Sequence, residues 1–264
     1  MQANSLEKWV DRRQANGKYW LTRAIAKTES GLSAEAVMKA LQRLVARHRL
    51  SKINDTFFAI VPLEYASAGA PPAAWFIDEL MRVLGRPYYV GLLTAAGLHG
   101  ASHQQPQEFQ VMTDRPIRPA KAGRTSLRFF QSKFVELMPV ERRKTPTGQM
   151  KISTAESTAV DLIRMSRSAG YLDHVATVIA ELSQTLNPGR LLAAVQIIAD
   201  VPTAQRLGFV LDLTSGTRLT KTLKKWIDTR SPKLIPLRSS HRTREGVVDR
   251  RWNVLVDQPL EIEA

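Results

Sequence analysis

The sequence contains no cysteine. This absence excludes disulfide bonds, iron–sulfur clusters, thiolate zinc sites and cysteine nucleophiles in one step. No apolar run approaches the roughly 18 residues that suggest a transmembrane helix. The first residues, MQANSLEKWVDRRQ, also lack the apolar stretch of a secretory signal. We therefore expect a cytoplasmic protein of bacterial type that does not engage a membrane.

Familiar motifs of catalysis and nucleotide binding are also missing, since there is no GxSxG, P-loop or GxGxxG pattern. His99 and His103 have a spacing that could supply two metal ligands on a helix, but glycines and Pro106 surround them. Glu156 and Asp161 would need further convergent carboxylates to form a nuclease or glycosidase site. We expect no metal, no cofactor and no enzyme activity, with a nuclease as the weakest alternative.

The chain has instead a large excess of positively charged residues. Among its 264 residues, 38 Lys and Arg oppose 24 Asp and Glu, which gives a net charge of +14. The length fits one large domain or two smaller ones. The surplus is spread along the chain, with about +5 in residues 1–64, +5 in 65–150 and +4 in 151–264. A balance of this kind is typical of proteins that meet a polyanion, most often nucleic acid.

The first 64 residues predict three short helices and a β-hairpin. Apolar periodicity indicates a helix from about residue 6 to the Asn16-Gly17 stop, with a short β-like run after it. A second helix follows Thr22, and a third runs from Ser33 to Arg47, each with its first residue as an N-cap. Two β-like runs then flank Asn54-Asp55. This order is typical of a winged helix-turn-helix domain.

The third predicted helix has the two faces that a DNA-reading helix needs. Its apolar stripe would pack on the first two helices, while its polar and basic face could enter a major groove. A small helical domain that binds protein or dimerises is the alternative. We predict base-edge or groove contacts from Lys39, Gln42 and Arg43, phosphate contacts from Arg47 and Lys52, and a phosphate at the backbone N–H groups near Ser33.

The rest of the chain predicts an α+β domain behind a linker. Residues 65–74 are rich in Pro, Ala and Gly, which favours a linker. In residues 75–264, Ser153 to Glu156 form a capping-box pattern at the start of a helix. The whole chain thus predicts an N-terminal winged helix-turn-helix followed by a larger mixed α/β domain. Helices are expected at 75–84, 88–98, 153–165, 172–185, 189–199, 203–213 and 217–227, and strands at 108–112, 127–131, 134–138, 149–152, 234–237 and 252–256.

Four stretches of the sequence resemble a known family, the AbiEi-type antitoxins. The most specific is PYYVGLLTAAGLHGASHQQPQEFQVMT at 87–113, because its Tyr, Gly and His-Gly spacing followed by His-Gln-Gln-Pro is unusual. Later segments of the family are similar to ISTAESTAVDLIR at 152–164, RLGFVLDL at 206–213 and RRWNVLVDQPLEIE at 250–263. The N-terminal pattern stands where this family places a winged helix, so the resemblance extends over nearly the whole chain.

The resemblance implies the antitoxin of a type IV toxin–antitoxin pair linked to abortive phage infection. It implies that the N-terminal domain binds inverted repeats in its own promoter and represses the operon. It further implies that the C-terminal domain opposes a nucleotidyltransferase-like toxin, without requiring a stable complex with that toxin. No catalytic residue and no individual base-contacting residue carries over to this sequence.

The densest basic stretch, residues 218–251, is our candidate for the antitoxicity surface. It holds 11 basic residues against Asp228, Glu245 and Asp249. A solvated surface would explain this density, as would an anionic partner such as RNA or the toxin. We choose Arg218, Lys221, Lys224 and Lys225 as its candidate residues.

Two other functions stay open at the level of sequence. A stand-alone winged-helix transcriptional regulator would bind DNA in the same way, with a ligand- or partner-binding C-terminal domain in place of antitoxicity. A nuclease would show clustered carboxylates and metal dependence, and the sequence shows no such cluster. The operator sequence, the toxin's target and the oligomeric state do not follow from the sequence.

Overall fold

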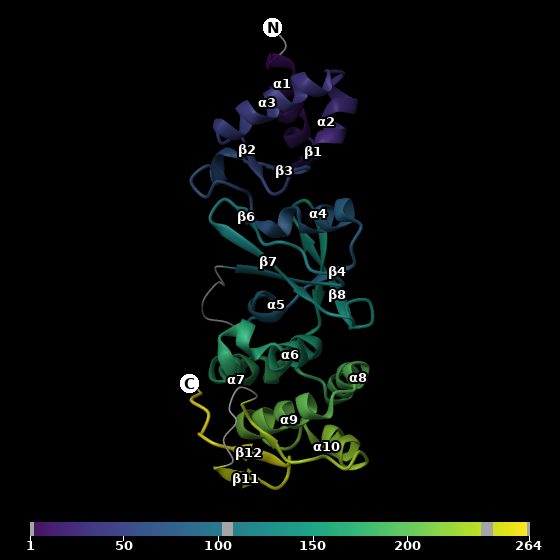
Figure 1. The fold of residues 1–264 in the computed structure, drawn as a ribbon, viewed down its shortest axis with the longest axis vertical. Helices are drawn as coiled ribbons and strands as arrows, with labels where there is room; N and C mark the ends of the chain where they lie inside the picture. Colours follow the sequence, from purple (N-terminus) through teal and green to yellow (C-terminus); the bar gives the residue numbers. More distant parts are fainter. Residues whose placement is uncertain (1–2, 102–107, 239–244, 263–264) are drawn as a thin grey trace. The chain divides into compact units, whose positions relative to one another are not determined.

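The computed structural model describes residues 3–101, 108–238 and 245–262 (Figure 1). The chain divides into two compact units. The first contains residues 1–88, 107–132 and 142–151, and the second contains residues 89–106, 133–141 and 152–264. The division therefore follows spatial packing and passes through several strands, whereas the boundaries expected from the sequence, at 64 and 74, follow composition.

The first unit begins with three helices and a small antiparallel sheet. The order is α1 (Ala3–Ala15), β1 (Trp20–Thr22), α2 (Arg23–Ser30), α3 (Ala34–Ala46), β2 (Leu50–Lys52) and β3 (Phe57–Ile60). The strands lie in the order β1-β3-β2, with Trp20 opposite Ala59 and Leu50 opposite Ile60. Asn54 forms the hairpin turn, because its side-chain oxygen accepts the backbone N–H groups of Thr56 and Phe57.

Local sequence signals begin these helices as predicted. The Thr22 hydroxyl accepts the Ile25 N–H at 3.1 Å and caps α2, while the Ser33 hydroxyl accepts the Ala36 N–H at 3.2 Å and caps α3. The predicted stripe of α3 is buried at Val37, Ala40, Leu41 and Leu44, and Val45 packs at its edge. These elements share one core of Leu6, Trp9, Val10, Leu21, Ala26, Val37, Ala40, Leu41, Leu44, Leu50, Phe58 and Ile60.

The segment expected as a linker is packed into the first unit. Residues 65–74 include buried Ala70 and Ala73, and the Arg124 N–H donates to the Ala68 carbonyl at 2.9 Å. A Cβ at Gly123 would overlap the backbone of residues 68–70. The composition favoured a linker, and the small residues here also allow two backbone segments to approach closely.

A six-stranded sheet follows, in the order β6-β7-β5-β4-β9-β8. Strands β5 and β7 are parallel, with Phe109 opposite Leu127. Val90 of β4 stands opposite Ile152 of β9, also in parallel. The elements are α4 (Ile77–Leu84), β4 (Tyr88–Val90), α5 (Leu92–Leu98), β5 (Glu108–Thr113), β6 (Ala120–Ala122), β7 (Thr125–Gln131), β8 (Val140–Thr145) and β9 (Gly148–Ser153).

Two sequence predictions fail in this region. Residues 88–98 do not form one helix, because the aromatic and β-branched residues 88–90 join the sheet and extended Gly91 separates them from α5. Residues 134–138 do not form a strand. The Phe134 carbonyl accepts the N–H groups of Leu137 and Met138, so this apolar stretch turns instead.

The second unit is mainly helical and ends in a small sheet. Its helices are α6 (Ala155–Arg164), α7 (Tyr171–Leu182), α8 (Pro188–Ile198), α9 (Val201–Ser215) and α10 (Lys221–Asp228), with a short 3-10 helix η3 (Ser166–Ala169) before α7. The strands β10 (Ile235–Pro236), β11 (Val247–Asp249) and β12 (Val254–Val256) lie in the order β10-β12-β11. The chain is therefore a mixed α+β protein with an N-terminal helical region, as its pattern predicted.

Candidate functional site

The exposed face of α3 carries three of the predicted DNA-contacting side chains. Lys39, Gln42 and Arg43 are all exposed, on the opposite side from buried Ala40 and Leu44. This division follows the helical period, in which residues three and four apart share a face. The structure thus places these three side chains together on one solvent-facing surface of the first unit.

Ion pairs hold several cations near this surface. The Lys39 ammonium lies 2.7 Å from Glu35, and Arg47 lies 3.8 Å from Glu7. On the hairpin, the Lys52 ammonium lies 2.8 Å from Asp55 and lowers the pKa of that carboxyl. These pairs are exposed and weak, so a phosphate could replace the carboxylates at little cost.

A groove of about 260 Å³ lies between α3 and the hairpin. Gln42 of α3 and Lys52 of β2 line it, together with Arg23 and the half-exposed Met38. Sequence reasoning missed Arg23 and Met38. Arg23 directly follows the N-cap Thr22, and its N–H donates to the Thr56 carbonyl, which ties α2 to the hairpin. The N-cap pattern at Thr22 predicts that α2 begins at the next residue, and this signal could have drawn attention to Arg23.

The predicted antitoxicity residues lie at α10 of the second unit. Arg218, Lys221 and Lys225 are exposed, whereas Lys224 is partly covered and pairs with Asp228. Leu223, Trp226 and Ile227 are buried and fix the opposite side of α10. Lys221 and Lys225 on the solvent side of this short amphipathic helix, and Arg218 just before it, have no ion pair among the residues that the structure describes.

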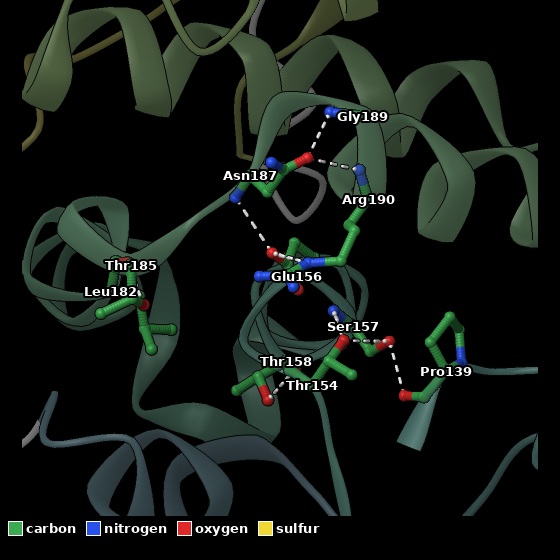
Figure 2. A network of polar contacts seen from close by, with 10 residues as sticks. All are labelled: Pro139, Thr154, Glu156, Ser157, Thr158, Leu182, Thr185, Asn187, Gly189 and Arg190. Carbon is green, nitrogen blue, oxygen red and sulfur yellow. Dashed lines mark hydrogen bonds and ion pairs between the residues drawn. The ribbon is translucent and has the colours of Figure 1, made fainter. Parts of the chain in front are cut away.

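A polar network joins α6 to the start of α8 (Figure 2). Glu156 is buried, and its Oε1 accepts the Asn187 N–H at 3.0 Å and the Arg190 Nε–H at 2.9 Å. The Asn187 side chain in turn caps α8 by accepting the N–H groups of Gly189 and Arg190. Burial alone would raise the pKa of Glu156, but these hydrogen bonds and the Arg190 charge outweigh it and lower that pKa.

This network corrects the capping-box prediction. The N-cap of α6 is Thr154, whose hydroxyl accepts the Ser157 N–H at 3.2 Å (Figure 2). Ser153 hydrogen-bonds to Thr158 instead. The Ser157 hydroxyl donates to the Pro139 carbonyl at 2.9 Å. The cap lies one residue later than the pattern suggested, and this leaves Glu156 facing α8.

The carboxylate of Asp161, the other candidate for a catalytic group, also has partners within the protein. Asp161 is fully buried, accepts the Tyr89 hydroxyl at 2.7 Å and pairs with Arg164 at 3.0 Å. Burial raises its pKa, against the opposing effects of Tyr89 and Arg164. The arginine partner and the full burial give Asp161 a structural role.

Of the two histidines considered as metal ligands, only His99 lies in the described part of the chain. The His99 Nε2 lies 2.8 Å from the Ser153 carbonyl oxygen, which assigns it a proton-donating structural contact. His103 lies outside the described residues. Within the described part of the chain, no group of three or more His, Asp or Glu residues could hold a metal ion, and no helix there is both long and apolar enough to cross a bilayer.

Comparison with solved structures finds a similar fold in another protein. The crystal structure of the RV2827C protein from Mycobacterium tuberculosis superposes with a TM-score of 0.69, covering 96% of this chain and 91% of that one. The two sequences are 14% identical, so the likeness concerns the fold alone. No curated protein sequence matches this chain.

A segment in the middle of the chain matches a known family model. The family model of the AbiEi antitoxin C-terminal domain matches residues 89–213, which begin at Tyr89 in β4 and end within α9. This segment contains the buried Glu156 and Asp161 and two of the three later stretches on which the resemblance rested. The match confirms the resemblance: residues 89–213 match the AbiEi antitoxin C-terminal domain, within a chain of mixed α+β fold.

Proposed function

We propose that this antitoxin also represses its own operon, with residues 1–64 as a winged helix-turn-helix domain that binds inverted repeats in the promoter. The observation that carries this proposal is the exposed face of α3 with Lys39, Gln42 and Arg43, of which Gln42 lines one groove together with Lys52 of the hairpin. An α-helix of this kind fits a major groove, and the flanking cations suit phosphates. The operator would be recognised in the cytoplasm.

Binding of the chain to its promoter DNA tests this proposal. Fluorescence anisotropy at fixed salt compares Arg43→Ala with Lys8→Ala, which removes one exposed charge from α1. If Arg43 reads a base, its loss weakens operator binding by about 1–3 kcal/mol, while Lys8→Ala changes it little. Equal affinities of both variants and the wild type would exclude base reading by Arg43.

Lys52 is proposed to contact a phosphate rather than a base. Lys52→Gln should weaken binding to all sequences alike and reduce the salt dependence by about one released counterion. The same titrations between low and high salt supply this slope. An effect confined to the operator sequence would contradict the assignment.

The C-terminal domain is proposed to supply antitoxicity through α10. Support comes from the clustered charges of Arg218, Lys221 and Lys225, which lack carboxylate partners among the residues described. The partner would be the toxin encoded beside the chain, a nucleotidyltransferase-like protein, or an RNA on which both act. Functional opposition needs no stable complex between the two proteins.

Co-expression with the neighbouring toxin tests this surface. Lys221, Lys224 and Lys225 are reversed to Glu together, and a control variant reverses Lys8 and Lys27 of the first unit. We expect the α10 variant to lose rescue of growth while it keeps its expression level and promoter binding. Full rescue would exclude α10 as the working surface, and a failure of the wild type to rescue would favour a stand-alone regulator.

A further inference from the structure

A second basic site, separate from α3 and α10, lies inside the second unit. A cavity of about 280 Å³ is bordered by the end of α6, η3, the start of α7, α9 and the segment after β10. Its wall holds Arg164, Arg167, Arg206 and Arg238 against a single carboxylate, Asp173. Four guanidinium groups around one small cavity favour an anionic ligand.

Two of these arginines are neutralised by the protein and two are not. Arg164 pairs with buried Asp161, and Arg238 pairs with Asp173 at 2.6 Å and with Asp257 at 3.4 Å. Arg206 donates only to the carbonyl oxygens of Pro236 and Leu237, and Arg167 is exposed. Neither has an ion pair in the described part of the chain, but the charge of Asp200 acts on Arg206, so Arg167 is the cation left for a ligand to pair with.

Carbonyl contacts also fix the direction of Arg206. Its Nε lies 3.0 Å from the Leu237 oxygen, and its Nη2 lies 3.0 Å from the Pro236 oxygen. Arg164 is held by a different contact, since its Nη1 donates to the Asp161 carboxylate at 3.0 Å. These two guanidinium groups are therefore positioned before any ligand arrives, which reduces the entropy lost on binding.

An exposed aromatic ring stands at the same cavity. Tyr171 lines it and is 67% exposed, although its backbone has the left-handed φ of +69°. Bulky residues rarely adopt this conformation. The preceding Gly170 also has a positive φ, and a Cβ there would press on the His174 ring. The turn thus holds an aromatic side chain in an unfavourable conformation, without the packing that would compensate for it.

We propose that this cavity binds a nucleoside phosphate, with the phosphate at the arginines and the base stacked on Tyr171. Guanidinium groups bind phosphate through charge-assisted hydrogen bonds, and an exposed tyrosine offers a face for base stacking. A protein surface of acidic residues would need a flatter and larger contact area than this cavity presents. The free nucleotide and the terminal nucleotide of an RNA share this chemistry.

Isothermal titration calorimetry of the full chain tests the site with AMP, GMP, adenosine and inorganic phosphate. Saturable binding of the nucleotides, tighter than that of adenosine or phosphate alone, is the expected result. An RNA oligonucleotide with a 5′-phosphate, compared with its 5′-hydroxyl form, then distinguishes the two sources of the ligand. Absence of saturable nucleotide binding, or binding of a glutamate-rich peptide in its place, overturns the proposal.

Substitutions at Tyr171 separate binding from folding. Tyr171→Gly suits the left-handed φ, so we expect the thermal midpoint to hold or rise while nucleotide affinity falls at least about fivefold through the lost stack. Tyr171→Phe keeps the ring and should bind within about twofold of the wild type. Wild-type affinity in Tyr171→Gly overturns the stacking assignment.

A charge-matched pair tests the arginines. Arg167→Gln should weaken nucleotide binding by about tenfold, because a charge-assisted contact to phosphate is lost. Arg218→Gln removes the same charge at the start of the α10 surface and should leave nucleotide affinity unchanged. Equal losses in both variants would show only a general effect of net charge and would overturn the site.

Discussion

The indole of Trp252 lies directly against Gly208 in the middle of α9, where any Cβ would overlap the ring. Trp252 is buried, and its Nε1–H donates to Asp212 at 2.8 Å, one helical turn further along α9. Its carbonyl accepts the Gln205 amide at 2.7 Å. The C-terminal segment is thereby fixed to α9 by one ring contact and two hydrogen bonds.

Gly208→Ala should therefore destabilise the second unit, although alanine normally favours a helix. We expect the free energy of unfolding to fall by about 1–3 kcal/mol, as overpacking in a filled core does, against a helix-propensity gain of about 1 kcal/mol. Urea unfolding followed by tryptophan fluorescence measures the change. In a Trp252→Leu background the same substitution should cost less, and equal costs in both backgrounds would show that the ring contact is not responsible.

The Glu156 network predicts a pH dependence of stability. Because the folded pKa of Glu156 is lowered, its stabilising effect is complete above the ordinary pKa of about 4.3 and is lost as the pH falls through the folded value. Glu156→Gln should lower stability at pH 7 by about 1–3 kcal/mol, since the Asn187 N–H and Arg190 lose a charged acceptor. The difference from the wild type should shrink in acid.

Thermal unfolding between pH 3 and 7 measures this difference. Glu35→Gln serves as a control, because Glu35 is exposed and forms a surface pair only. A gap between Glu156→Gln and the wild type that stays constant over this range would refute the predicted linkage.

The sequence predicted correctly where several helices begin, but it did not predict which residues distant in the sequence are in contact. Thr22 and Ser33 act as caps as expected, because an N-cap needs only residues three positions away. Glu156 also fits a local capping pattern, yet its partners are Asn187 and Arg190, about thirty residues later. Such contacts depend on which helices pack together, and the sequence pattern carries no information about this choice.

The candidate sites show the same limit. Lys39, Gln42 and Arg43 could be chosen together because they share the face of one helix. The cavity arginines come from α6, η3, α9 and the segment after β10, so their convergence depends on tertiary structure alone. The left-handed conformation of Tyr171, which follows Gly170, has no local signal in the sequence either.

Tyr89 and Asp161 form a buried hydrogen bond, and its contribution to the free energy of unfolding should depend on the charge of the Asp161 carboxylate. Tyr89→Phe removes the hydroxyl that donates to Asp161 at 2.7 Å and should cost about 1.5–3 kcal/mol, as for bonds to charged groups. In an Asp161→Asn background the acceptor is neutral, so the same change should cost about half as much. A double-mutant cycle by urea unfolding gives the coupling energy. Additive losses would show that the two side chains act independently.

Ser33 has two predicted roles, and a single substitution separates them. Its hydroxyl caps α3, and the N–H groups of the following turn are the proposed phosphate site. Ser33→Asp keeps a good N-cap and adds a negative charge where the phosphate would bind. We expect the free energy of unfolding to stay within about 0.5 kcal/mol of the wild type, while promoter binding weakens by about tenfold through charge repulsion.

Ser33→Asn is the matched control, since asparagine caps a helix without adding charge. It should preserve both stability and DNA affinity, whereas Ser33→Ala should lower stability by about 1 kcal/mol. Anisotropy titrations at two salt concentrations show whether the loss in Ser33→Asp is electrostatic, because such a loss diminishes as salt screens the charges. If Ser33→Asp binds the promoter as tightly as Ser33→Asn, the start of α3 does not face a phosphate, and the orientation proposed for α3 on DNA must be abandoned.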